Sequence, residues 1–217
     1  MRENAFTRGH KALVSKTKAA SDLRETIKEA VNLLGGFEQV ISSGDKVVVK
    51  PNFNSAHPFP ATSDPEFVKA VVSLLYDSGA SEVTIVESTG FPWPPTREVF
   101  EKTGMVEAAG ECGAKLKPLD NGEWVEVDIG GRRLKRAWMA KDVFDGAKLV
   151  WIPCMKTHHW AKFSLSLKLT VGLMRHRDRR RLHLGGLEEK IAELNLAVRP
   201  DIIVMDARRC IVTGGPN

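Results

Sequence analysis

Cysteines are few in this sequence, and none forms a motif. Cys112, Cys154 and Cys210 are widely separated, and none belongs to a C-x-x-C pair. This spacing excludes an iron–sulfur or zinc-ribbon motif within the chain and gives no disulfide framework. We therefore interpret Cys154 as a small buried hydrophobic residue.

Long apolar runs and nucleotide motifs are also missing. No run approaches the roughly 20 residues that cross a bilayer, and the amino-terminal residues are too polar for a signal-peptide core. We therefore predict a cytoplasmic protein with no membrane partner. There is no internal repeat and no G-x-G-x-x-G, Walker or H-E-x-x-H pattern that would indicate a nucleotide or zinc site.

The composition is that of an ordinary globular protein. The 217 residues are 42% hydrophobic and 27% charged, which is enough for one sizeable core. The net charge of +5 favours anionic partners, and much of the excess lies in Arg175–Arg181, where five of seven residues are arginine.

The order of apolar segments predicts an α/β fold. A valine-rich strand at 46–49, a helix at 65–76 and a strand at 82–86 form a crossover unit with parallel strands. Further strands are expected at 115–119, 147–152 and 202–205, and helices at 21–34 with Ser21 as cap, from 96, at 140–144 and at 187–197. A two-glycine hairpin is expected within 120–138.

These elements predict a mostly parallel sheet flanked by helices, with a β-hairpin excursion, in one α/β domain over residues 1–217. The chain closes on a turn signal after Thr213, so we expect it to be the N-terminal part of a longer protein. Phe91 and Trp93 lie in a proline-rich loop beside a strand end, which favours either a lid or a hydrophobic contact with the core.

Four predicted strands end in polar residues. Because ligands of open α/β sheets lie beyond the carboxyl ends of the strands, these ends predict a shared site. The residues expected to bind a small anion are Lys50, Asn52, Asn54, Glu87, Ser88, Lys156, Thr157 and Arg208. Those expected to handle protons are His158, Lys168 and Asp206.

The histidines also suit a transition metal. His158, His159 and His183 can supply imidazole nitrogens, with Glu87 or Asp206 adding a carboxylate. Since neighbours on an extended segment point to opposite sides, we expect only one of the adjacent pair to enter a given site. Hydrogen bonding within a loop is the alternative interpretation.

Two basic features have alternative interpretations. Lys168 lies in a mostly apolar stretch, so it either reaches solvent or is partly desolvated, which would lower its pKa and suit proton transfer or covalent attachment. The run 175–181 is interpreted as a mobile basic loop bordering an anion site or as a solvated surface loop. Nucleic-acid binding is the weaker interpretation, because the run lacks interleaved aromatic residues.

Ordered segments resemble the uncharacterised family catalogued as domain of unknown function 362. They run from Lys46 to Pro216 and read VVVKPNFN, DPEFVKAVVSLL, GASEVTIVES, MKTH, LKLTVG and DIIVMDA with GGP. Members of that family usually have asparagine after the lysine, whereas Leu169 follows Lys168 here. The resemblance implies an α/β protein, and because several members carry a ferredoxin-like iron–sulfur module, it implies an iron–sulfur partner for this chain.

A fainter similarity links His158, Lys168 and His183 with the nickel-pincer lactate racemases, and it implies a nickel cofactor. Taken together, we expect an enzyme that binds a small anionic substrate or cofactor at the carboxyl edge of the sheet, with metal-assisted or redox-linked chemistry. The alternatives are a nucleic-acid-binding module that uses residues 175–181 and a non-catalytic partner of an iron–sulfur protein.

Overall fold

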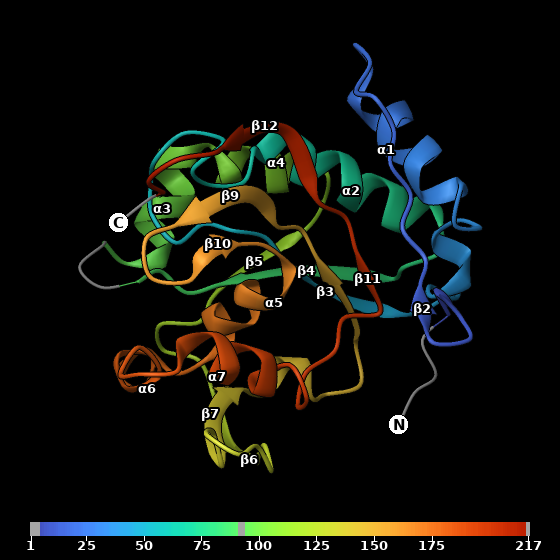
Figure 1. Ribbon diagram of the computed structural model, residues 1–217. Coiled ribbons are helices and arrows are strands. Elements are labelled where there is room, and N and C mark those ends of the chain that lie inside the picture. Colours follow the sequence, from blue (N-terminus) through green and yellow to red (C-terminus); the bar gives the residue numbers. More distant parts are fainter. Residues whose placement is uncertain (1–4, 91–93, 216–217) are drawn as a thin grey trace.

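A parallel β-sheet forms the centre of the computed structural model, which describes residues 5–90 and 94–215 (Figure 1). Within these residues the sheet has five strands in the order β11, β8, β3, β4, β5, and every neighbouring pair is parallel. The strands are β3 Lys46–Lys50, β4 Glu82–Glu87, β5 Lys115–Pro118, β8 Lys148–Trp151 and β11 Ile202–Ile203. The predicted α/β class is confirmed, while the loop with Phe91 and Trp93 lies outside the described residues.

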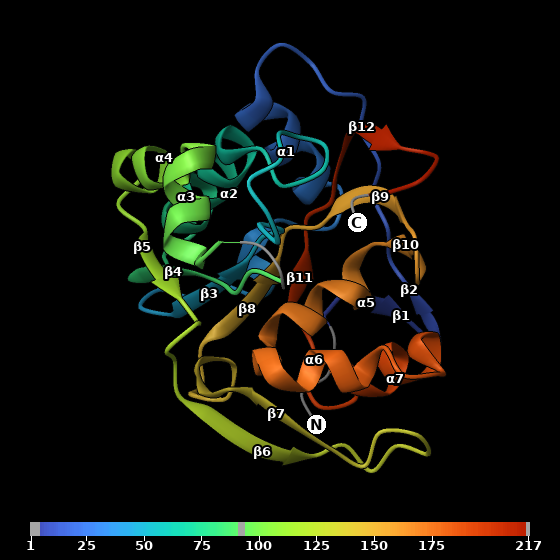
Figure 2. The same ribbon diagram turned by 90° about the vertical axis from the view of Figure 1, so that its left-hand side faces the viewer.

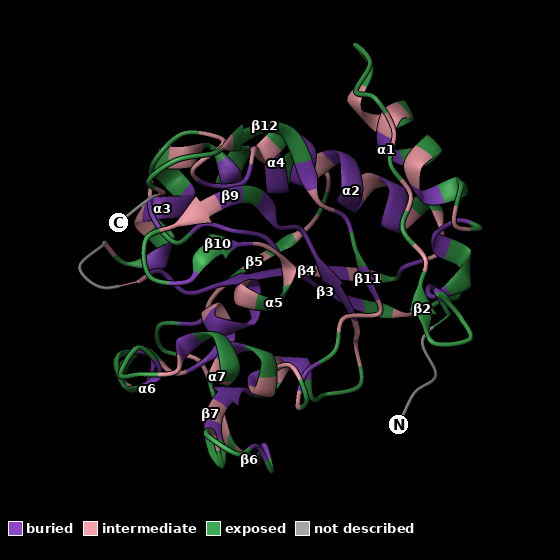
Figure 3. Cartoon of the chain, in the orientation of Figure 1, coloured by how far each residue is buried: buried purple, intermediate pink, exposed green. Residues whose placement is uncertain are grey.

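Valines on both faces explain the central place of β3. Val47 and Val49 belong to one buried apolar cluster, and Val48 belongs to another on the opposite face. Successive side chains of a strand point to opposite faces, so a strand that is covered on both sides needs an apolar residue at each position. Figure 3 shows the buried strands at the centre and the exposed surfaces of the helices outside them.

Four helices cover one face of the sheet, and they pack against the cluster that holds Val47 and Val49. They are α1 Leu23–Asn32, α2 Pro65–Asp77, α3 Thr96–Thr103 and α4 Met105–Glu111. Figures 1 and 2 show these helices on one side of the sheet and α5, α6 and α7 on the other.

Aspartates begin the first two helices. The Asp22 carboxylate accepts a hydrogen bond from the Glu25 N–H at 3.0 Å, and the Asp64 carboxylate accepts one from the Glu66 N–H at 3.0 Å. Each carboxylate satisfies a donor that the first turn of a helix leaves free. The prediction of Ser21 as the cap of α1 is therefore wrong, because Asp22 occupies that position.

The opposite face is covered by a hairpin and by several short helices. These elements are β6 Trp124–Asp128, β7 Arg136–Ala140, η2 Lys141–Val143, α5 Ser166–Leu169, η3 Thr170–Leu173, α6 His176–Leu182 and α7 Leu187–Leu194. They enclose the second apolar cluster, which includes Val48 and Trp151. Peripheral elements are β1 Thr7–Arg8, β2 Lys11–Ala12 and η1 Phe37–Gln39. No helix among the described residues is both long and apolar enough to cross a bilayer.

The predicted hairpin is present, but its second strand lies further along the chain. β6 pairs antiparallel with β7, and residues 129–135 form a longer connection than a two-glycine turn. The Glu193 carboxylate accepts hydrogen bonds from three backbone N–H groups of this connection, those of Arg132, Arg133 and Leu134. The helix predicted at 140–144 is wrong, because β7 continues to Ala140 and only a single 3-10 turn follows.

The strand order reverses between β3 and β8. From β3 the chain moves outward through β4 to β5, and it then crosses to the other side of β3 to form β8 and β11. In open α/β sheets the crevice beyond the carboxyl ends at such a reversal is the usual ligand site. Lys50 ends β3 directly beside Trp151 at the end of β8, so both residues lie at the point of reversal.

A small second sheet extends beyond the point of reversal. After the central strands β8 and β11 end, the chain forms β9 Cys154–His158 and β12 Asp206–Ile211, which pair in parallel, and β10 Lys162–Ser164 pairs antiparallel with β9. The segment that contains Lys156 and His158 is therefore a strand of its own, which follows the strand predicted at 147–152. The strand predicted at 202–205 ends at Ile203, and the helix predicted at 187–197 ends at Leu194.

Candidate functional site

A buried ion pair joins the carboxyl ends of β3 and β4. Lys50 Nζ lies 2.6 Å from Glu87 Oε1, and the two side chains are 1% and 2% exposed. Lys50 also donates to the Pro51 carbonyl at 2.6 Å, while Glu87 accepts from the N–H groups of Phe53 at 2.6 Å and Ser88 at 2.9 Å. Burial lowers the pKa of Lys50, and the neighbouring Glu87 carboxylate opposes that shift.

The backbone of η3 lies directly against this pair. A Cβ atom on Gly172 would lie 2.8 Å from Lys50 Cε and 3.1 Å from Glu87 Oε1. Both separations are shorter than ordinary van der Waals contacts, so a side chain at this position would displace Lys50. The glycine in LKLTVG therefore allows the close approach of η3 to the pair.

Arg179 of α6 links the segment after β4 to η3 through hydrogen bonds. Its guanidinium donates hydrogen bonds to four carbonyl oxygens, those of Gly172, Met174, Ser88 and Thr89, at 2.7–3.0 Å. Burial lowers the pKa of Arg179 to about 10, and Glu87 partly counteracts this effect. The guanidinium is therefore a fixed positive charge at the site.

The expectation of a mobile basic loop at 175–181 is wrong, because most of the run forms helix α6. Arg179 points inward, whereas Arg175 pairs with Asp178 at 2.7 Å and stacks over Trp138 at 4.4 Å. Arg177 and Arg181 are exposed. The arginines are thus divided between the interior and the surface, which weakens the interpretation of the run as a continuous phosphate-binding stripe.

Lys156 of β9 adds a second buried lysine. It is 4% exposed, and its ammonium donates to the Ala61 carbonyl. Burial lowers its pKa to about 8, with Lys50 lowering it further and Glu87 opposing the shift. The next residue, Thr157, has a buried Oγ1 with no hydrogen-bond partner among the described residues.

Lys168 of α5 is the third lysine of the group. Its side chain is partly buried, which supports the desolvated interpretation over the solvent-reaching one. Burial lowers its pKa to about 8, and the charges of Lys156, Arg179 and Lys50 contribute in the same direction. We call Lys50, Lys156, Lys168 and Arg179 the cationic cluster.

The asparagines after β3 differ in their surroundings. Asn52 is 6% exposed, and its backbone is held by Ser63 through hydrogen bonds of 2.9 Å and 2.8 Å. Its side-chain Oδ1 is buried and has no partner within the described part of the chain. Asn54 is exposed and lies beside Gly90, where a Cβ would be 2.7 Å from Asn54 Oδ1. Of the two, only Asn52 offers a buried acceptor near the end of β3.

The three histidines have different surroundings. His158 Nδ1 accepts from the N–H groups of Trp160 at 3.1 Å and Ala161 at 3.2 Å, so this nitrogen is already used inside the β9–β10 turn. Burial, followed by the charge of Lys168, lowers the pKa of His158 to about 3, so the ring is neutral at physiological pH. His159 is exposed and lies edge-on to Trp160, and the ring of exposed His183 contacts the Arg179 carbonyl at 2.7 Å.

Metal binding therefore stays a prediction. Among residues 5–90 and 94–215, no three His, Cys, Asp or Glu side chains form a group that could hold a metal ion.

Asp206 and Arg208 largely neutralise each other. The Arg208 guanidinium donates to both oxygens of Asp206, at 3.0 Å and 2.7 Å, and to Asp64 at 2.6 Å. These contacts raise the pKa of Arg208. The register of β12 places Asp206 beside Cys154, near the predicted site, but its carboxylate is engaged in this ion pair. The structure therefore brings the two residues to the edge of the site without leaving either charge free.

Two residues of the site, Gly172 and Arg179, were not predicted from the sequence. Gly172 belongs to the predicted LKLTVG segment, and Arg179 is one of five arginines in the run 175–181. A helical spacing would have revealed Arg179, because Arg175, Arg179 and Leu182 share one face, and Leu182 is buried. For Gly172 the only signal was the glycine after an apolar stretch.

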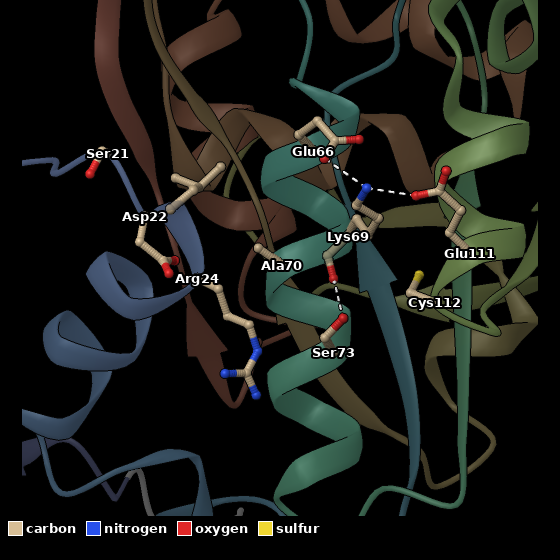
Figure 4. Close-up of a pocket in the computed structure, with 10 residues that line it drawn as sticks. Ser21, Asp22, Arg24, Glu66, Lys69, Ala70, Ser73, Glu111 and Cys112 are labelled. Atoms are coloured by element: carbon tan, nitrogen blue, oxygen red, sulfur yellow. Dashed lines mark hydrogen bonds and ion pairs between the residues drawn. The ribbon is translucent and has the colours of Figure 1, made fainter.

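A separate groove of about 740 Å³ lies between α1, α2 and α4 (Figure 4). Its central cation is already paired, since Lys69 Nζ lies 2.7 Å from Glu66 and 2.6 Å from Glu111. None of the predicted site residues is among the described residues that line it. The chemistry therefore points to the carboxyl ends of β3 and β8 instead.

The fold and this cluster define a class: a doubly wound α/β protein with buried cations at the point where its strand order reverses. Residues 47–217 match the family described as domain of unknown function (DUF362), and the chain belongs to that family. It is also 21% identical over 212 residues to a thylakoid-associated protein, sll1697, of Synechocystis sp.. That match covers 94% of this chain and 64% of the relative, so the chain spans less than two thirds of the relative's length.

Proposed function

We propose that this protein binds a small anionic substrate or cofactor, a carboxylate or a phosphate, at the carboxyl ends of β3 and β8. One observation carries the proposal: the cationic cluster brings four cations together, and among the described residues Glu87 is the only carboxylate that forms an ion pair with one of them, Lys50. Burying charge of one sign is costly unless an opposite charge is present. A bound anion would supply the missing negative charge.

The cluster divides into structural and ligand-binding cations. Lys50 is paired with Glu87, and Arg179 is surrounded by backbone carbonyls, so both are fixed in place. Lys156 and Lys168 have no carboxylate partner among the described residues, so they are the residues that would contact the anion. Asn52 Oδ1 and Thr157 Oγ1 are buried without partners and would orient it by hydrogen bonding.

Nucleic acid is a weaker candidate for the anion. An extended phosphate backbone needs exposed cations, whereas Lys50, Lys156 and Arg179 are buried. The surface arginines of α6 alone would have to bind it. An iron–sulfur partner stays a prediction based on the family resemblance.

The experiment is a thermal-unfolding titration with phosphate, sulfate and small mono- and dicarboxylates at constant ionic strength. A ligand at a hundredfold of its Kd stabilises the native protein by about 2.7 kcal/mol. We expect at least one of these anions to raise Tm in the wild type and to lose that effect in Lys156→Gln and Lys168→Gln. Lys141→Gln is the matched control, because Lys141 is 47% exposed and pairs with Glu123 on the surface.

The two outcomes are distinct. Equal stabilisation of all variants would mean that anions act elsewhere on the surface, and the proposal would be wrong. Binding of a short oligonucleotide at low salt, unchanged in the two cluster variants, would favour the nucleic-acid alternative.

A further inference from the structure

Lys168 differs from the other members of the cationic cluster in having no hydrogen-bond or ion-pair partner within residues 5–90 and 94–215. Lys50 is bonded to Glu87 and Pro51, Lys156 to Ala61, and Arg179 to four carbonyls. Among the described residues, no acceptor forms a hydrogen bond or an ion pair with Lys168 Nζ. A partly buried ammonium with three positively charged neighbours and no acceptor is unfavourable, so a larger share of Lys168 is the neutral amine near neutral pH than for an ordinary lysine.

A neutral lysine amine is a nucleophile. Lysines become nucleophilic when they are desolvated or lie next to other cations, and their usual targets are carbonyl carbons. Lys168 meets both conditions, and burial and its charged neighbours lower its pKa to about 8. The same neighbours, Lys156 above all, would hold an anionic group close to the amine.

Hydrogen bonds from Asn195 fix the backbone on both sides of Lys168. Asn195 Nδ2 donates to the carbonyl of Leu167 at 2.9 Å, next to Lys168 in the chain, and to that of Ile191 at 2.8 Å. Asn195 Oδ1 also accepts from Thr170 Oγ1 at 2.8 Å, so α5 and η3 are both anchored to α7. A catalytic side chain needs such a support to keep its geometry.

We propose that Lys168 forms an imine with the carbonyl carbon of a small anionic ketone or aldehyde, such as a 2-oxo acid. This inference rests on the proposed function, because the cationic cluster must hold the anionic group of the same molecule. It narrows the ligand class from any small anion to one that carries a carbonyl group next to or near its charge.

The step balances without a further reactant. The Lys168 nitrogen adds its lone pair to the carbonyl carbon, and a proton moves from nitrogen to the carbonyl oxygen, which gives a carbinolamine. The second proton of the amine nitrogen then passes to the hydroxyl oxygen, the C–O bond breaks and water leaves, while the nitrogen–carbon double bond forms. Hydride from added borohydride reduces this imine to a stable secondary amine.

The test uses pyruvate as the probe, with borohydride, followed by peptide mapping of the whole protein. We expect one reduced pyruvyl group at Lys168, absent in Lys168→Arg, which keeps the positive charge. Lys162, which is 79% exposed, is the internal control, and Lys162→Arg is the matched variant. Because the pKa of Lys168 is lowered to about 8, we expect labelling at Lys168 to exceed that at Lys162 by at least about tenfold near neutral pH.

An experiment with an anion that has no ketone or aldehyde group distinguishes imine formation from anion binding alone. An anion that raises Tm, as described above, should also suppress labelling at Lys168. If such an anion stabilises the wild type but pyruvate leaves no adduct at Lys168, the imine proposal is wrong and the anion site stands. Labelling spread equally over Lys168 and Lys162 would also overturn the proposal, because it would reflect ordinary surface reactivity.

Discussion

Replacing Glu87 by glutamine tests whether the buried pair controls the energetics of the site. The substitution keeps the shape of the side chain and removes the charge that Lys50 contacts at 2.6 Å. Breaking a buried ion pair by removing one partner costs about 3–5 kcal/mol, because the other charge stays buried. The free energy needed to deprotonate Lys50 sets an upper limit on this cost.

In the variant, Lys50 can avoid the free-energy cost of a buried unpaired charge by losing its proton. Neutralising a lysine of ordinary pKa costs about 4.6 kcal/mol at pH 7 and about 1.9 kcal/mol at pH 9, at 1.36 kcal/mol per unit. In Glu87→Gln the folded state would hold a neutral Lys50 while the unfolded state stays protonated. The unfolded state then binds more protons, so the stability of the variant rises with pH in this range.

We therefore expect Glu87→Gln to lose about 3–5 kcal/mol of unfolding free energy at pH 7 and about 2.7 kcal/mol less than that at pH 9. Urea unfolding followed by circular dichroism at both pH values measures the difference. Adding Lys50→Met should abolish the extra pH dependence, because no buried ammonium remains.

A surface pair provides the control. Glu98 and Lys102 lie one turn apart on α3 with both side chains largely exposed, so Glu98→Gln should cost less than about 0.5 kcal/mol at either pH. A loss in Glu87→Gln of less than about 1 kcal/mol, or a loss that does not change between the two pH values, would refute the reasoning.

Three further predictions concern the same region. Gly172→Ala should lose about 1–3 kcal/mol in urea unfolding, because its Cβ would press on Lys50, whereas Gly110→Ala, with open space at its Cβ, should not destabilise the protein. Anion affinity, measured by calorimetry, should weaken as the pH rises through about 8, where the two lysines with lowered pKa values lose their positive charge. Burial raises the pKa of the Cys154 thiol to about 11, so alkylation at pH 8 should modify exposed Cys210 and spare Cys154, and equal labelling would contradict the structure.

The architecture could be predicted because it depends on local patterns. The valines of 47–49 require cover on both faces of a strand, and the segment around Asp64 and Pro65 carries its own helix start. Such signals lie within a few residues of one another, so the strand and helix order followed from the sequence. Boundaries were less certain where apolar residues continued past the end of an element, as at residues 202–205.

The sequence also indicated which strand ends carry chemical groups, but not how those groups pair. It placed Lys50, Glu87 and Lys156 at one edge of the sheet, since parallel strands bring their carboxyl ends together. It could not show that Arg208 is neutralised by Asp64, which lies 144 positions away in the chain. Interactions over such distances depend on the packing of β12 against β9 and α2.

The tertiary structure alone decided which cations face inward. Five arginines lie in one run, yet only the rotation of α6 against the sheet directs Arg179 to the carbonyls of Ser88 and Gly172. Likewise, only folding places Lys168 beside three other positive charges, with no acceptor for its ammonium in the described part of the chain. The sequence by itself determined the α/β fold and the chemical groups at the sheet edge, because periodicity and turn residues act locally. The tertiary structure decided which of these groups are buried, paired or left without a partner, because desolvation and charge–charge interactions depend on distances in space.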